Sequence, residues 1–324
     1  MTARQDKRDS LSGLVARLRR RWRERDLITV CVPAYQSADV IGEALQSLAA
    51  QTYRNIRVLI SLDPSGDDTD KVCEPFLSDP RFTLVRQPTR LGWPGNVNFL
   101  LDQVRTEYYC LMFHDDVVEP DYLAHLVRAL RKSPSSLCVY PLLKHFGRQP
   151  GESSIISLEG NPCERALRFF AQPLNSAAIR GLTRIEALHR GLRLRELGTG
   201  GFIAETLYVF ELALLGNCKR VGRAIYHHRY RPVSVSKEWK AWSDERKRAG
   251  WRRLLQEYCA VIRRQGFTEQ QNLSLLEAAL PWAFQIATWL PSSATEQAAI
   301  ADPVQRAALA QAWLGDPRSN PPLL

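Results

Sequence analysis

Short apolar runs alternate with amphipathic helical segments over residues 27–140, and this alternation leaves few possible folds. The first run, residues 27–33, is continuous and rich in β-branched residues, which is typical of a strand buried on both faces. Strand–helix alternation with short loops predicts an α/β fold with a parallel, doubly wound sheet. The predicted strands span residues 27–33, 56–62, 82–85, 108–113 and 137–140.

After residue 147 this pattern weakens and then becomes helical. Residues 204–215 predict a helix and 221–230 a strand. From residue 238 the chain predicts helices with recurring tryptophans, one of them broken near Pro281, because proline lacks an amide donor. The predicted organisation is a basic helix over 1–26, an α/β domain over 27–236 and a helical region over 237–324.

The first 26 residues carry nine basic and four acidic side chains, which is half of the net charge of +10. Leu11, Leu18 and Trp22 recur at helical spacing, so an amphipathic helix is expected. Two interpretations stay open: the helix docks on its own domain, or residues 8–25 bind an anionic membrane surface. Nucleic acid is not an expected partner, because stacking aromatics beyond Trp22 are missing.

The seven cysteines are odd in number and form no Cys-x-x-Cys pair. This argues against a disulfide framework and a zinc knuckle, and predicts buried, reduced thiols in a cytoplasmic compartment. The first 26 residues lack the apolar core of a signal peptide. The apolar stretch 273–290 contains Glu277, Pro281 and Gln285, so no membrane-spanning helix is expected.

Polar side chains follow two of the predicted strands, at the sheet edge where such folds bind ligands. His114, Asp115 and Asp116 follow the fourth strand. Adjacent carboxylates repel each other and favour a bound cation, although one of them would equally cap the next helix. Asp63 follows the second strand, where its carboxylate would accept hydrogen bonds from a nucleotide base or form an Asx turn.

Three common site motifs are missing. The chain contains no Gly-x-Gly-x-x-Gly after a strand, no Gly-x-x-x-x-Gly-Lys-Ser/Thr and no Gly-x-Ser-x-Gly. A dinucleotide-dependent dehydrogenase, a P-loop enzyme and the commonest serine hydrolase of this architecture are therefore disfavoured.

An ordered set of motifs resembles family 2 glycosyltransferases. Ile-Thr-Val-Cys-Val-Pro-Ala-Tyr over 28–35 is followed by Gln-Thr-Tyr-Arg-Asn over 51–55 and Leu-Ile-Ser-Leu-Asp over 59–63. The set continues with Arg-Leu-Gly-Trp-Pro-Gly-Asn-Val-Asn over 90–98 and with the strand and acidic residues of 108–120. The resemblance covers residues 27–132 closely and 175–236 loosely. Each motif alone is common, whereas the ordered set is specific.

The resemblance implies the GT-A fold and transfer of a sugar, with inversion, from a nucleotide-sugar to a saccharide or lipid-linked acceptor. A UDP-sugar donor, a Mn²⁺ or Mg²⁺ cofactor and bacterial surface polysaccharide or glycolipid synthesis are the expected setting. It also implies that His114 and Asp116 hold the metal on the diphosphate. The residues expected around the donor nucleotide are Pro33, Tyr35, Asp63, Arg90 and Asp115.

The resemblance further implies a general base at the start of the helix over 204–215. Counting back from Gly216 places Glu205 at that position. The other interpretation is a first-turn acid that interacts with the helix dipole. His228, Arg229 and Arg231 are expected either to reach the diphosphate or to form a solvated basic loop.

Four positions depart from the family pattern. The acidic triplet begins with His114 instead of Asp, and Leu62 and Val97 stand where Asp and Arg are common. Ala204-Glu205 replaces the usual Glu-Asp, so the expected base is a longer carboxylate. These departures motivate the alternative function, a non-catalytic homologue that binds a nucleotide-sugar or a glycan.

Overall fold

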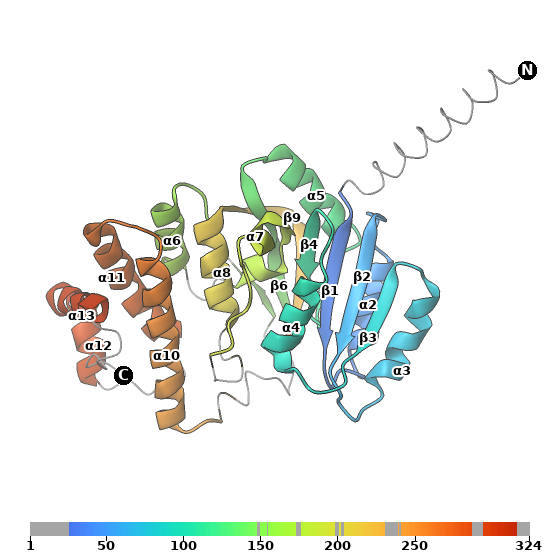
Figure 1. Ribbon diagram of the computed structural model, residues 1–324, viewed down its shortest axis with the longest axis horizontal. Coiled ribbons are helices and arrows are strands. Elements are labelled where there is room, and N and C mark those ends of the chain that lie inside the picture. The colour runs from blue at the N-terminus through green and yellow to red at the C-terminus, as the bar shows by residue number, and fades with distance from the viewer. Residues whose placement is uncertain are drawn as a thin grey trace, which may run out of the picture.

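The computed structural model describes residues 26–147, 150–153, 155–172, 176–197, 201, 204–230, 239, 241–286 and 294–315. The expected basic helix of residues 1–26 lies outside this part of the chain except for Asp26. One mixed sheet runs through the molecule, with β1–β3 at one end and the C-terminal helices at the other (Figure 1). Among the described residues, no helix is both long and apolar enough to cross a bilayer.

The described strands form one nine-stranded sheet with the order β3-β2-β1-β4-β8-β6-β9-β5, and β7 pairs with β6. Strands β1 to β4 are mutually parallel, as the sequence predicts. All seven residues of β1 are buried, which explains its uninterrupted apolar run. The strands are β1 (Ile28–Ala34), β2 (Ile56–Leu62), β3 (Phe82–Arg86), β4 (Tyr108–Leu111), β5 (Val117–Val118), β6 (Ser136–Gly147), β7 (Gly151–Glu152), β8 (Leu182–Arg184) and β9 (Asn217–Tyr230).

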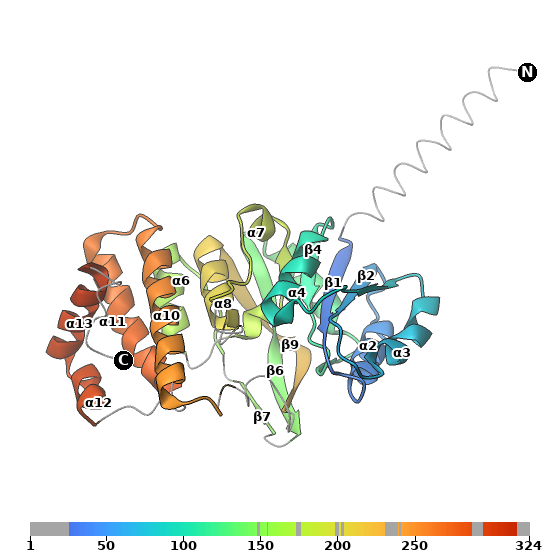
Figure 2. The ribbon, with the colours of Figure 1, turned by 60° about the horizontal axis from the view of Figure 1, so that its bottom comes forward.

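The five strands predicted over residues 27–140 all point the same way, but the sheet is mixed beyond β4. Strand β8 lies between β4 and β6 and is antiparallel to both. It has three residues, which is too short for a periodic signal in a stretch where the pattern weakens. Because β6 is antiparallel to β8, it points the same way as β4, and β9 is parallel to β6. Six strands therefore direct their carboxyl ends to one edge of the sheet, from which β7 also projects (Figure 2).

Helices pack on the sheet through apolar stripes. Helix α2 buries Ile41, Ala44, Leu45 and Leu48, which share one helical face. Asn161 caps α6 in a reciprocal capping box with Glu164. The helices near the sheet are α2 (Ile41–Ala49), α3 (Thr69–Cys73), α4 (Gly92–Asp102), α5 (Tyr122–Lys132), α6 (Pro162–Phe170), α7 (Glu186–His189) and α8 (Ala204–Leu215), with 3₁₀ turns η1 (Glu74–Ser78) and η2 (Ala177–Arg180).

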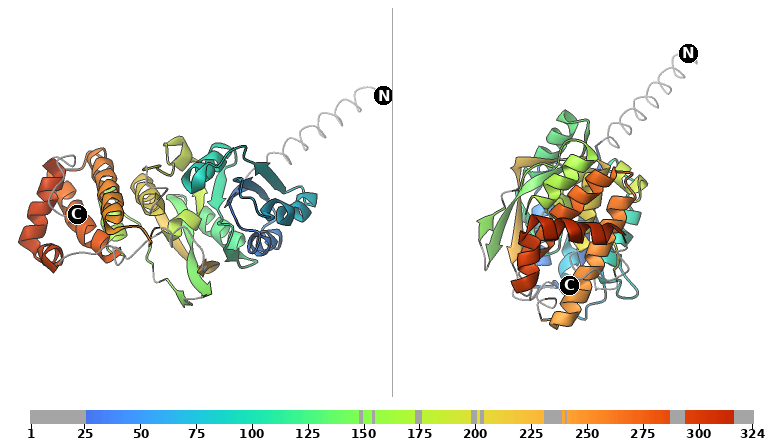
Figure 3. Two further views of the ribbon diagram at one scale, coloured as in Figure 1. Left: turned by 90° about the horizontal axis from the view of Figure 1, so that it is seen from below. Right: turned by 90° about the vertical axis from the view of Figure 1, so that its left-hand side faces the viewer.

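The C-terminal helices share a core with α6 and α8 (Figure 3). Phe169, Phe210, Tyr258 and Trp282 form one aromatic cluster, with ring centroids 4.9 to 6.3 Å apart. The expected break near Pro281 is wrong, because α11 continues through it. These helices are α10 (Asp244–Arg263), α11 (Glu269–Ile286), α12 (Ala294–Ala301) and α13 (Pro303–Gly315).

The domain boundary expected at 236/237 lies outside the described residues and stays a prediction. All seven cysteines are buried, free thiols, as the sequence predicts.

Candidate active site

The carboxyl edge of the sheet brings the expected donor residues together. The Asp63 amide donates to the Ala34 carbonyl over 3.0 Å, which joins the ends of β1 and β2. His114, after β4, forms a 3.0 Å hydrogen bond from Nδ1 to the carbonyl of Pro33. A carbonyl only accepts, so Nδ1 carries a proton and donates this bond. This bond places the acidic loop of residues 114–116 beside the end of β1.

Tyr35 and Arg90 lie in direct contact. The guanidinium of Arg90 stacks over the ring of Tyr35, with its central carbon 4.0 Å from the ring centroid. Tyr35 is half-buried and Arg90 is exposed. The two residues come from different loops, after β1 and after β3, and both were expected at the donor nucleotide. Their stacking gives the edge a planar cationic surface at its solvent side.

Asp63 has a structural role in addition to its predicted one. Its carboxylate is 1% exposed and accepts the amides of Leu91 and Gly92 over 3.1 and 2.9 Å. These amides open α4, where helix geometry leaves N–H groups without internal partners. Asp63 thereby fixes the start of α4 and the loop that carries Arg90. Contact between Asp63 and a nucleotide base remains a prediction. Each carboxylate oxygen keeps a lone pair that could accept a hydrogen bond from the base.

Replacing Asp63 with alanine is expected to lower the free energy of unfolding by about 1.5–3 kcal/mol, because two buried amides lose a charged acceptor. Chemical denaturation measures this loss. Asp102→Ala, at the exposed other end of α4, removes only a surface ion pair and is expected to cost under about 1 kcal/mol. Equal losses in the two variants would contradict the capping role.

Asp116 is enclosed by protein. Its side chain has no exposed surface. Oδ2 accepts the Tyr226 hydroxyl over 2.7 Å and Nε of Arg180 over 3.4 Å, and Oδ1 accepts the Arg229 amide over 2.9 Å. Three donors, one of them cationic, therefore surround the carboxylate expected to bind the metal.

The predicted metal pair does not fit this geometry. Asp116 has no exposed surface and is paired with the Arg180 cation, so an ion that approached its carboxylate would meet a fixed positive charge. His114 keeps one ring nitrogen available, and Asp115 is half-buried. Within the part of the chain that the structure describes, no group of three or more His, Cys, Asp or Glu side chains is placed to hold a metal. The role of Asp116 that the geometry supports is pairing with Arg180.

Arg229 is committed to protein partners. Its Nε donates to the Asp115 carbonyl over 2.9 Å, and Nη2 pairs with Glu43 over 2.5 Å. Its guanidinium also lies over the Phe146 ring, 4.5 Å from the centroid. Arg229 therefore ties β9 to the acidic loop in this structure, and its expected contact with the diphosphate stays a prediction. Arg231 lies outside the described residues.

His228 belongs to a cluster of three rings at the ends of β6 and β9. Its ring lies 5.4 Å from that of His145 and 5.0 Å from that of Tyr230, and the two histidines share a 3.3 Å Nδ1–Nδ1 hydrogen bond. Burial and then the Arg180 cation lower the pKa of His228 to about 3, and the same two causes lower the pKa of His145. Both imidazoles are therefore neutral at pH 7.

Glu205 occupies the first turn of α8, at this edge of the sheet. Its Oε2 is buried without a hydrogen-bond partner among the described residues. Burial raises the pKa of the Glu205 carboxyl, while its own backbone amide and Arg180 act in the opposite direction. A carboxylate that is shielded from water and has an unused oxygen is suited to accept a proton.

A glycine is required next to Glu205. Gly201 has φ of +77°, and a Cβ there would overlap Trp93 and Pro94 of α4. Trp93 also donates from Nε1 to the Gly201 carbonyl over 3.1 Å. Because the Ala204 amide in turn donates to Gly201, this contact sets where α8 starts relative to α4.

Arg180 and Tyr226 are the site residues that the sequence did not reveal. Arg180 ends η2, whose four residues are all buried. A single arginine inside the apolar run Ala-Ala-Ile-Arg-Gly-Leu was the available signal, because a buried cation needs a partner. Tyr226 lies between two half-buried residues of β9, and no pattern marks its hydroxyl as a partner of Asp116.

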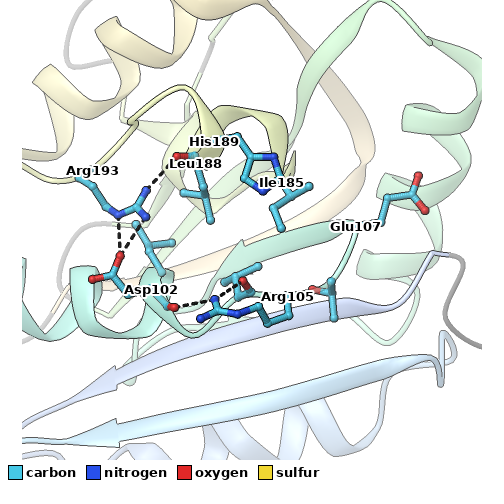
Figure 4. Close-up of a pocket in the computed structure, with 10 residues that line it drawn as sticks. Asp102, Arg105, Glu107, Ile185, Leu188, His189 and Arg193 are labelled. Atoms are coloured by element: carbon cyan, nitrogen blue, oxygen red, sulfur yellow. Dashed lines mark hydrogen bonds and ion pairs between the residues drawn. The ribbon is translucent and has the colours of Figure 1, made fainter.

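A separate pocket of about 530 Å³ lies at the opposite edge of the sheet, before β4 (Figure 4). Its charges are largely paired with the protein. Arg193 binds Asp102 over 2.9 Å, and Arg105 donates to the carbonyls of Asp102 and Val104. None of the expected site residues lines it, so the candidate active site is the carboxyl edge.

Known structures share this fold. The crystal structure of Staphylococcus aureus TarS 1–349 in complex with UDP-GlcNAc matches with a TM-score of 0.67 and 17% identity, covering 83% of this chain and 77% of that one. The mannosyltransferase PcManGT from Pyrobaculum calidifontis, in complex with GDP-Man and Mn²⁺, matches with a TM-score of 0.53 and 18% identity, covering 89% and 83%. The fold is therefore the GT-A fold of glycosyltransferases.

The sequence comparisons agree. Residues 29–179 match the model of glycosyl transferase family 2. An uncharacterized glycosyltransferase of Rickettsia prowazekii is 28% identical over 106 residues, covering 33% of this chain and 32% of that protein. Glycosyltransferase GlyG of Streptococcus pneumoniae is 24% identical over 115 residues, covering 35% and 38%. The matches thus span about a third of these relatives' length. Residues 29–179 are therefore similar to family 2 glycosyltransferases, as the motifs predict.

Proposed function

We propose that this chain is an inverting glycosyltransferase that moves a sugar from a nucleotide-sugar to a hydroxyl group of an acceptor. The family, the fold and the placement of acidic and cationic groups at one sheet edge support this reaction. TarS is crystallised with UDP-GlcNAc, which favours a UDP-sugar as the donor. The acceptor we infer is a saccharide or a lipid-linked saccharide.

The buried carboxylate of Glu205 is the main support for this proposed reaction. Its carboxylate has an unused buried oxygen at the start of α8. In a single displacement, the acceptor oxygen bonds to the anomeric carbon as its proton passes to Glu205. At the same time the bond from that carbon to the phosphate oxygen breaks, and its electron pair leaves with the nucleoside diphosphate. Inversion follows because attack and departure occur on opposite faces of the sugar.

The donor nucleotide would lie along the ends of β1 and β2. Pro33, Tyr35 and Asp63 line this part of the edge, and Arg90 stacks on Tyr35. The Asp115 carboxylate acts electrostatically on His228, and we expect it to contact the ribose or the donor sugar. Neutral His228 would donate a hydrogen bond to a phosphate oxygen.

The Mn²⁺ or Mg²⁺ cofactor that the resemblance implies has a parallel in one of the solved structures. PcManGT is complexed with Mn²⁺. In this chain, however, three protein donors enclose the Asp116 carboxylate. No step of the proposed reaction therefore uses an ion bound to Asp116.

The cellular setting is proposed on the sequence. Seven buried free thiols support a reducing, cytoplasmic location. The basic segment of residues 8–25 would hold the enzyme at the inner face of a membrane that carries the acceptor, in bacterial surface polysaccharide or glycolipid synthesis.

A thermal-shift panel tests the proposal. The protein is heated with UDP-, GDP-, dTDP- and CMP-sugars, each with Mn²⁺, with Mg²⁺ and with EDTA. A donor that binds only the native state at 100 times its Kd stabilises that state by about 2.7 kcal/mol, so one nucleotide class is expected to raise Tm. The control is the same concentration of the free sugar. An unchanged Tm with every nucleotide would contradict the proposed function.

A further inference from the structure

Arg180 is a buried cation in the middle of the candidate active site. Its side chain is 10% exposed. Its guanidinium carbon lies 4.7 Å from the centroid of the Phe113 ring and 5.5 Å from that of Tyr226. Its backbone carbonyl accepts the Tyr122 hydroxyl, which anchors the end of η2 to α5. The charged group is thus held rigidly between the acidic loop and β9.

Most of the donors of Arg180 are unused. A guanidinium has five N–H donors in a planar fork. Within the described residues, Arg180 donates one hydrogen bond, from Nε to Asp116, and that bond is long at 3.4 Å. Its two terminal nitrogens form no hydrogen bond with the described protein groups. The remaining N–H groups are therefore available to a ligand that supplies acceptors.

The surroundings of Arg180 indicate what that ligand is. On one side lies Asp116 of the acidic loop, and on the other Glu205, whose carboxylate feels the Arg180 charge. The two nearby imidazoles, His145 and His228, are neutral and add no positive charge. Asp116 offsets the positive charge of Arg180. Among the described residues, no second cationic side chain contacts Asp116, so the unused donors of Arg180 are the groups that would meet an anionic ligand here.

The proposed function brings such a group to this place. The diphosphate of the donor must lie between the nucleotide, at the ends of β1 and β2, and the anomeric carbon that faces Glu205. Phosphate oxygens match the planar fork of arginine, which binds them in pairs. A cation fixed before the reaction stabilises charge that develops on the leaving group.

We propose that Arg180 binds the donor diphosphate and stabilises it as it leaves, in place of a divalent ion on Asp116. This inference rests on the proposed function. Asp116 then acts as a positioning residue, because its carboxylate orients the guanidinium from the side opposite the ligand. When the glycosidic bond breaks, the electron pair stays on the phosphate oxygen beside Arg180, and the acceptor proton goes to Glu205.

Isothermal titration of UMP, UDP, GMP and GDP into the full chain, in EDTA and in Mn²⁺, tests this inference. UDP or GDP is expected to bind in EDTA. Arg180→Gln is expected to weaken that diphosphate at least 10-fold and to change the matching monophosphate less than about 2-fold. Arg180→Lys keeps the charge but loses the planar fork. Its affinity for the diphosphate is therefore expected to lie between those of the wild type and Arg180→Gln.

Two further variants separate binding from folding. Arg180→Gln leaves Asp116 buried without a cation, so the double variant Arg180→Gln/Asp116→Asn removes both charges and is expected to show the same selective loss. Arg184→Gln is the matched control. Arg184 lies four residues on and donates to the carbonyls of Ser136 and Leu130, so diphosphate binding is expected to be unchanged.

Three outcomes would overturn the inference. One is binding of the diphosphate by the double variant as tightly as by the wild type. Another is an equal loss for monophosphate and diphosphate, which would mark Arg180 as a structural residue. The third is wild-type binding that disappears in EDTA and returns with Mn²⁺. Wild-type protein that binds no nucleotide in either condition would instead contradict the proposed function, and the inference with it.

Discussion

Glu205→Gln is expected to lower kcat by about 10²- to 10⁴-fold while leaving the affinity for the donor unchanged. Glutamine keeps the shape of the side chain but cannot accept the acceptor's proton, and general-base catalysis contributes a factor of this size. The measurement is turnover of the nucleotide-sugar identified by the thermal-shift panel, together with its binding constant. Glu211→Gln, on the same helix but paired with Arg195, is the matched control and is expected to keep kcat.

The stability of Glu205→Gln provides a second, independent readout. Burial raises the pKa of Glu205 in the folded protein above its unfolded value, so the fold favours the protonated form. Stability from this group is present at low pH and is lost as the pH rises through the raised pKa. At pH 7 the glutamine variant is therefore expected to melt no lower than the wild type. A lower Tm, or retained turnover, would contradict the assignment of Glu205 as a base.

The pH profile of the wild type follows from the same shift. A base must be ionised to act, so kcat/KM is expected to fall as the pH drops through the pKa of Glu205. That acidic limb is expected above the ordinary glutamate value of about 4.3. Loss of the limb in Glu205→Gln would link it to this residue, whereas an identical limb in the variant would assign it to another group.

The sequence predicts the first half of the fold well because β1 to β4 carry their own signal. Strands β1 and β4 are wholly buried and β2 is mostly buried, so each is a run rich in apolar residues. Strand β8 gives no such signal with its three residues, although it decides that the sheet is mixed. Helix α11 passes Pro281 because tertiary packing of Leu280 and Trp282 outweighs the local penalty.

The candidate site, like the fold, could be predicted from the sequence only in part. Motif order places Tyr35, Asp63 and Glu205 at one edge, since parallel strands end together. Motif order does not show which carboxylate of a pair turns inward. Asp115 and Asp116 are neighbours in sequence, yet one is half-buried and the other fully enclosed. That difference is created by Arg180 and Tyr226, which come from segments more than 60 residues away.

Asp116→Ala is expected to lower the free energy of unfolding by about 3–5 kcal/mol, the range for removing one partner of a buried ion pair. The variant leaves the Arg180 guanidinium without its carboxylate and the Tyr226 hydroxyl without its acceptor. Chemical denaturation of the protein in EDTA measures the loss. If Asp116 served only as a metal ligand, its removal would relieve repulsion in the metal-free protein, and the free energy of unfolding in EDTA would stay the same or rise.

Two comparison variants sharpen this prediction. Asp115→Ala removes the neighbouring, half-buried carboxylate and is expected to cost less than half as much, because Asp115 is partly exposed to solvent whereas the Asp116 side chain has no exposed surface. Arg180→Gln/Asp116→Ala removes both charges, so the double variant is expected to be more stable than Asp116→Ala alone. This recovery of stability would indicate that Asp116→Ala leaves an unpaired buried cation. A metal site formed by Asp116 would gain no stability from the loss of Arg180. A double variant less stable than either single one would show that Arg180 and Asp116 contribute independently, and that the carboxylate is not held for the cation.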